Sequence, residues 1–113
     1  MNEYTLEPLL EDYSDSPDIL RQILGIFLEE TPQRLDALRS ALQSGDRETI
    51  AKTAHSLANT TGTVRGENAL SIARNAEYAA RHQSEEEMRD AVHVLLEEVE
   101  HMLSVMRDYL NAA

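Results

Sequence analysis

The feature that most limits what this chain can fold into is a run of apolar residues near its C-terminus. They follow one another at steps of four and three positions: Met88, Val92, Leu95, Val99, Met102, Met106 and Tyr109. Such steps keep side chains on one side of an α-helix, whereas a strand sends successive side chains to opposite faces. Leu96, Leu103 and Leu110 widen this stripe. The pattern predicts a long helix whose apolar face must be buried against other helices.

The residues before this stretch predict further helices, separated by residues typical of helix ends. Ser16-Pro17 combines an N-cap residue with a proline at the first helical position. The helix that follows carries the apolar residues Ile19, Ile23, Leu24, Ile26 and Phe27. Thr31-Pro32 repeats the same chemistry, so it predicts either the start of another helix or a kink. The apolar positions after this proline are Leu35, Leu38 and Leu42.

Two more helices are predicted in the middle of the chain. Ser44-Gly45-Asp46 ends one helix and caps the next, whose apolar stripe consists of Ile50, Ala54, Leu57, Thr61 and Val64. Gly62 and Gly66 bracket the exit from this helix. The segment after them is rich in small apolar residues, namely Ala69, Ile72, Ala73, Ala76 and Ala80, which let helix backbones pack closely. Ser84 and Glu87 have the spacing of a capping box, which predicts the start of the last helix.

These signals together predict the fold class. No segment alternates in the manner of a strand, and aromatic residues make up only 4% of the chain. We therefore predict an all-α fold, an antiparallel four-helix bundle with an additional N-terminal helix, in which residues 1–113 form a single domain. Short connections favour packing within one chain. The alternative is that the last helix pairs with a second copy and serves as an oligomerisation domain.

The charge of the chain restricts its partners. Asp and Glu total 21 against 10 Lys and Arg, so the formal net charge is −11. Such a chain repels nucleic acid and anionic lipid surfaces, and no apolar run approaches the roughly 20 residues that a membrane span requires. The absence of cysteine excludes disulfides and thiolate chemistry. We expect a soluble, cytoplasmic monomer that binds neither nucleic acid nor membranes.

One histidine stands out among the candidate functional residues. His55 follows Ala54 of the buried stripe, so its side chain lies about 100° around the helix and points toward the flank or the solvent. The residues that share its face are mostly small: Ala51, Lys52, Ala58, Asn59 and Gly62. We therefore expect the ring to be accessible to another macromolecule. A single histidine on a helix is most often an ordinary surface residue, so spacing alone does not identify a function.

The chemistry of the imidazole ring suits a phosphoryl acceptor. The neutral ring is well populated near pH 7, so a ring nitrogen can act as a nucleophile without a dedicated base. Lys52, the only lysine in the chain, lies one helical turn before His55 and could balance the charge of an added phosphoryl group. Arg65 and Arg74 are further candidates for a basic patch.

The segment around this histidine resembles the signature of histidine phosphotransfer (HPt) domains, which usually reads His-x-Leu-Lys-Gly-small-small-Gly. The matching residues are His55, Leu57, Thr60, Thr61 and Gly62. The stretch from Phe27 to Pro32 and the Gly45-Asp46 turn also look like that family. The resemblance extends from about Pro17 to Tyr109 in the order and approximate length of the helices.

The motif is degenerate at two positions. The lysine three residues after the histidine is Ala58 here, and the glycine after that lysine is Asn59. In the family the lysine helps to hold the phosphoryl group, so its loss weakens that stabilisation unless Lys52 or Asn59 compensates. A module that docks on a receiver or kinase without transferring phosphate is therefore the alternative interpretation.

The resemblance also implies partners and a division of the chemistry. The expected function is phosphorelay signalling, with His55 carrying a phosphoryl group between a histidine kinase or receiver aspartate and a response regulator. The receiver would supply the aspartate and the Mg²⁺, so this chain needs no cofactor of its own. It would be a phosphocarrier and not a stand-alone catalyst, whether free-standing or part of a sensor histidine kinase. The partner surface would comprise Ala51, Lys52, Ala58, Asn59, Gly62 and Arg65 around His55.

A second group of histidines has a spacing that metal sites use. His93, Glu97 and His101 recur every fourth residue, so they share one face of the last helix. Glu98 and Glu100 show that the same helix is densely charged, which favours an ordinary solvated face. The chain has no cysteine and no His-Glu-x-x-His motif, and we predict no metal site.

Overall fold

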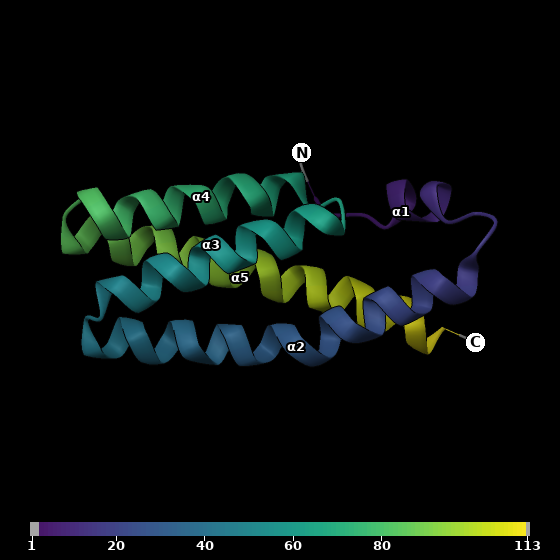
Figure 1. Ribbon diagram of the computed structural model, residues 1–113, viewed down its shortest axis with the longest axis horizontal. Coiled ribbons are helices and arrows are strands. Elements are labelled where there is room, and N and C mark those ends of the chain that lie inside the picture. The colour runs from purple at the N-terminus through teal and green to yellow at the C-terminus, as the bar shows by residue number, and fades with distance from the viewer. Residues whose placement is uncertain (1–2, 113) are drawn as a thin grey trace.

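Helices form nearly the whole of this protein. The computed structural model describes residues 3–112, and within them it contains five helices and no strand: α1 (Glu7–Asp12), α2 (Pro17–Ser44), α3 (Arg47–Thr63), α4 (Glu67–His82) and α5 (Glu85–Asn111). Figure 1 shows α2 to α5 as an elongated bundle with the short α1 at one end. The prediction of an all-α bundle with an additional N-terminal helix is confirmed. None of the described helices is both long and apolar enough to cross a membrane.

Helix α5 buries its apolar stripe inside the same chain. Every residue of the predicted stripe from Met88 to Met106 is at most 1% exposed, and only Tyr109 at its end is half-buried. The helix begins with the predicted capping box, in which the Ser84 hydroxyl accepts from the Glu87 amide at 3.1 Å. Because this stripe already packs against α2 and α4, it offers no surface for a second copy. The alternative of an oligomerisation domain built on this stripe is therefore wrong.

Helix α2 continues through Pro32, so the prediction of a separate helix starting there is wrong. Pro32 lacks an amide hydrogen and so removes one backbone hydrogen bond, which kinks or breaks a helix. Buried residues lie on both sides of the proline, including Leu24, Phe27, Leu35 and Leu38, so packing holds the two halves in one helix. Figure 1 shows a change of direction partway along α2, in line with the alternative of a kink.

Specific contacts fix where α3 begins relative to α4. Gly45 ends α2 with φ of 72°, and the Asp46 carboxylate accepts from the Thr49 amide at 3.1 Å. Arg47 then reaches the end of α4, where its guanidinium donates to the carbonyl oxygens of Ala80 at 3.0 Å and Gln83 at 2.9 Å. The last carbonyls of α4 are therefore paired with a cation, which the helix dipole favours.

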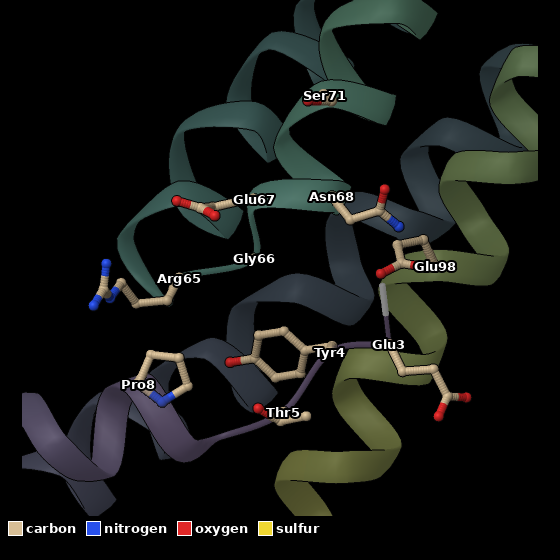
Figure 2. A pocket seen from close by; sticks show the side chains of 10 residues that line it. All are labelled: Glu3, Tyr4, Thr5, Pro8, Arg65, Gly66, Glu67, Asn68, Ser71 and Glu98. Atoms are coloured by element: carbon tan, nitrogen blue, oxygen red, sulfur yellow. The ribbon is translucent and has the colours of Figure 1, made fainter. Parts of the chain in front are cut away.

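The N-terminal segment holds the opposite end of α3. The hydroxyl of Tyr4 donates to the carbonyl oxygen of Val64 at 2.8 Å, and burial raises the pKa of this phenol. An added Cβ at Gly66 would stand 2.7 Å from the Met102 Cε and 3.1 Å from the Thr61 carbonyl oxygen, so a larger residue at this turn would have to displace the Met102 side chain. Figure 2 shows the pocket at this turn, lined by residues of the N-terminal segment and α1, the turn, the first turns of α4, and Glu98 of α5.

Candidate functional site

The two helices that carry the candidate site pack closely. Every buried residue of α4 is an alanine: Ala69, Ala73, Ala76, Ala79 and Ala80. On α3, Ala51, Ala54 and Ala58 are buried as well. The distance between packed helices depends on the size of the side chains at the contact, and alanine is the smallest side chain with a Cβ. Polar residues beside these alanines can therefore reach from one helix to the other.

His55 lies at the edge of this contact with its ring in solvent. Its side chain is 62% exposed, and its Nδ1 lies 3.2 Å from Oε1 of Glu77 on α4. The Glu77 side chain is only 23% exposed, so the carboxylate is partly covered by its neighbours. The ring is thus accessible, as the sequence predicted, and it is also oriented by a residue that the sequence did not single out.

The contact with Glu77 distinguishes the two ring nitrogens. A carboxylate only accepts hydrogen bonds, so Nδ1 carries the proton when this bond forms. In the neutral ring the lone pair then lies on Nε2, because the hydrogen bond made by one nitrogen selects the tautomer. Nε2 is therefore the nucleophilic nitrogen of the oriented ring.

Charged residues surround this pair on the side of the α3 N-terminus. The Arg81 Nε lies 3.7 Å from Oε2 of Glu77, and another nitrogen of Arg81 lies 3.8 Å from Oε2 of Glu48. Lys52 reaches the other oxygen of Glu48 at 3.6 Å. These pairs are exposed and long, so each contributes little to stability. They do gather two cations close to the imidazole of a strongly acidic protein.

The residues predicted to share the face of His55 differ in how exposed they are to solvent. Lys52 and Asn59 are exposed and Gly62 is half-buried, so a partner can reach them. Ala51 and Ala58 are only 1% and 3% exposed, on a helix that packs against both α4 and α2. A partner could therefore touch little of these two alanines, and the prediction that the face around His55 binds a partner stays a prediction.

Neither arginine named from the sequence makes an ion pair with the carboxylates around His55 within residues 3–112. Arg65 lies beyond the last residue of α3, in the left-handed backbone region with φ of 62°, and its Nε donates to Asp12 at 3.1 Å. Arg65 is exposed, so its part in a basic patch or in binding a partner stays a prediction. Arg74 is exposed on α4, without an ion pair in the described part of the chain.

Sequence reasoning missed Glu77, Arg81 and Glu48. A signal for the first two was present, since each follows an alanine of the buried α4 stripe, Ala76 and Ala80, and so lies at the edge of the helix contact. This pattern does not say which helix lies opposite. Glu48 is a first-turn acidic residue of α3, which by itself suggests only a favourable interaction with the helix dipole.

The remaining histidines do not assemble into a site. His93, Glu97 and His101 are exposed along α5. Among residues 3–112 no group of three or more His, Cys, Asp or Glu side chains is arranged to hold a metal ion. The pocket in Figure 2 is lined by Glu3, Glu67 and Glu98 and lies at the turn between α3 and α4, away from His55.

Comparisons with known proteins bear on the segment that contains these residues. A protein-family model described as Hpt domain matches residues 22–109. The match runs from the first turns of α2 nearly to the end of α5, and it includes His55 and Glu77. No curated protein and no solved structure matches the chain.

Proposed function

The chain belongs to the Hpt domain family, and from this premise we propose that it carries a phosphoryl group on His55 between a histidine kinase or receiver aspartate and a response regulator. Membership in the family places the chain in two-component phosphorelay signalling in general terms. Domains of this family generally interact with receiver domains and histidine kinases.

One observation carries this proposal, namely an exposed imidazole whose Nδ1 is held by a carboxylate. In the transfer step, the Nε2 lone pair forms a bond to phosphorus while the bond between phosphorus and the aspartate oxygen of the receiver breaks. The aspartate leaves as a carboxylate. The ring becomes positively charged as Nε2 gives up its lone pair, and Glu77 stabilises that charge through Nδ1–H. Mg²⁺ belongs to the receiver, and we assign it no ligand on this chain.

We propose that a partner docks where α2 and α3 lie side by side, because α2 carries a row of exposed apolar residues there. Ile19 and Ile26 are 50% and 57% exposed, and Ile23 is half-buried between them. Ile23, Ile26 and Phe27 also line a pocket of about 150 Å³, together with Thr60 and Thr63 of α3. Exposed isoleucines on an acidic protein suit a transient interface with an apolar centre and a polar rim. Such an interface would bury roughly 1,200 Å² or less in total.

The test uses phosphorylated receivers and active histidine kinases as donors. We expect acid-labile label on the wild-type chain and none on His55→Gln. His93→Gln removes another exposed histidine, on α5, and should retain the label. Label that persists in His55→Gln would show that another residue is the acceptor and would refute the proposal.

A docking module that does not transfer phosphate is the second candidate, and Ala58 is the observation that favours it. This residue replaces the usual lysine and is 3% exposed, so it cannot hold a phosphoryl group. If the module only docks, several competent donors leave His55 unlabelled, while a receiver still binds. That binding should weaken when the apolar row is broken by Ile26→Asp. Val94→Asp, at a 48% exposed position on α5, should leave it unchanged.

A further inference from the structure

We propose that Arg81 on α4 is the cation that holds the phosphoryl group of phosphorylated His55, and that Glu48 keeps this arginine in place while the ring is free. This inference rests on the proposed function, because it concerns the phosphorylated state of the same residue. It starts from Ala58, which is uncharged and buried under α4 at the position where a lysine is usual.

The position of Arg81 relative to the ring comes from a shared carboxylate. Glu77 contacts His55 Nδ1 through Oε1 at 3.2 Å and Arg81 Nε through Oε2 at 3.7 Å. Within residues 3–112, Arg81 is the lysine or arginine that shares an ion-pairing carboxylate with His55. One carboxylate therefore orients the imidazole with one oxygen and the guanidinium with the other.

The direction of the side chains places the ring on the side of Arg81. Helical side chains lean toward the N-terminus of their helix, so His55 leans toward the turn of α3 that carries Lys52 and precedes it. Arg81 lies at this level, because it also contacts Glu48 near the start of α3. The absent lysine at position 58 would have approached from the opposite, C-terminal side. Arg81 therefore offers a positive charge on the N-terminal side of the ring.

Charge explains why Arg81 would change partners. In the free state, Arg81 and Lys52 share Glu48 at 3.8 and 3.6 Å, distances too long for strong hydrogen bonds. A phosphoryl group brings between one and two negative charges and three acceptor oxygens, so it outcompetes a single exposed carboxylate. Arginine matches phosphate geometry with two parallel hydrogen bonds, whereas lysine acts as a point charge. The other nearby arginine, Arg34, already donates to Ser56 at 3.0 Å.

The experiment phosphorylates the ring chemically, so it needs no partner protein. With phosphoramidate, a ring nitrogen forms a bond to phosphorus, and the bond between phosphorus and the amine breaks to release ammonia. The exposed histidines also react, and phosphorylated His93 on α5 serves as an internal reference in the same sample. The proton-binding constant of each phosphoryl group is read from a ³¹P NMR titration in the weakly acidic to alkaline range, around its second pKa of about 6.

A nearby cation favours the fully deprotonated phosphoryl group and so weakens proton binding. We expect Arg81→Gln to strengthen proton binding at phosphorylated His55 by about three- to tenfold, the range of one charge-assisted contact, and Arg81→Lys to restore part of the loss. Glu48→Gln should have the opposite sign, because it releases both cations toward the ring. Arg107→Gln, which removes one charge from an exposed site on α5, should have no effect.

A second readout reports contact directly. The Nε–H resonance of Arg81 should shift when His55 is phosphorylated, and that of Arg107 should not. The proposal is overturned if Arg81→Gln changes the proton-binding constant of phosphorylated His55 no more than that of phosphorylated His93. It is also overturned if the Arg81 Nε–H resonance does not shift on phosphorylation. A chain that shows the Arg81 effect yet accepts no label from any phosphorylated receiver or kinase would refute the proposed function and leave this inference standing.

Discussion

Helices α4 and α5 follow each other in the chain and differ in what they bury. Helix α4 buries alanines alone, whereas α5 buries large residues such as Met88, Leu95, Met102 and Met106. Burying a large apolar side chain contributes about 1.5–3 kcal/mol, and an alanine contributes much less. The difference shows that the two helices have separate tasks. Helix α5 supplies stability, and α4 supplies the short distance that brings Glu77 and Arg81 to His55.

The largest expected effect tests the task of α5. We expect Leu95→Ala to lower the free energy of unfolding by about 2–5 kcal/mol, because Leu95 is fully buried and leaves a cavity. The contact between His55 and Glu77 should survive in the folded fraction, since neither residue lies on α5. Urea unfolding gives the stability, and the Nδ1–H resonance of His55 reports the contact. Val94→Ala, at the exposed neighbouring position, should change neither.

A substitution in the close contact of α4 should cost less stability than the one in α5 but should disturb the site more. We expect Ala73→Leu to cost about 1–3 kcal/mol, because a larger side chain must be forced into a close helix contact. It should also push α4 outward and abolish the His55–Glu77 hydrogen bond, seen as loss or displacement of the Nδ1–H resonance of His55. Ala37→Leu makes the same change at an exposed position of α2 and should preserve that resonance. If Ala73→Leu left it intact, close packing would not be the reason for the site.

The smallest expected effect concerns the start of α3, which sets its register against α4. The hydroxyl and the backbone amide of Thr49 donate to the Asp46 carboxylate and lower its pKa. A carboxyl group with a lowered pKa stabilises the folded state above its ordinary titration range, near pH 4, and this stabilisation is lost as the pH falls through the lowered pKa. The thermal midpoint of Asp46→Ala should therefore lie below that of the wild type at pH 7, and the gap should narrow in acid. Asp46→Asn keeps a hydrogen-bond acceptor that does not titrate. The thermal midpoint of this variant should therefore lack the pH dependence that the Asp46 carboxylate contributes.

Local patterns predicted most elements of the fold. The stripe on α5, the capping box at Ser84 and the turn at Gly45-Asp46 depend on residues a few positions apart, so the sequence contains all of their determinants. Pro32 is the exception, because the buried residues on both sides of it keep α2 in one piece. A local rule fails where packing from other parts of the chain is stronger.

The sequence by itself determined that this chain is helical, which stripe of the last helix is buried, and that His55 points away from the core. Only the tertiary structure decided that Glu77 orients the ring, that Arg81 and Glu48 stand beside it, that Ala51 and Ala58 are covered, and that Arg65 pairs with Asp12 instead. The physical reason is the distance along the chain over which each feature is determined. Helix formation and side-chain direction follow from neighbours within a turn or two, whereas the surroundings of a surface residue depend on which helix lies against it and how closely.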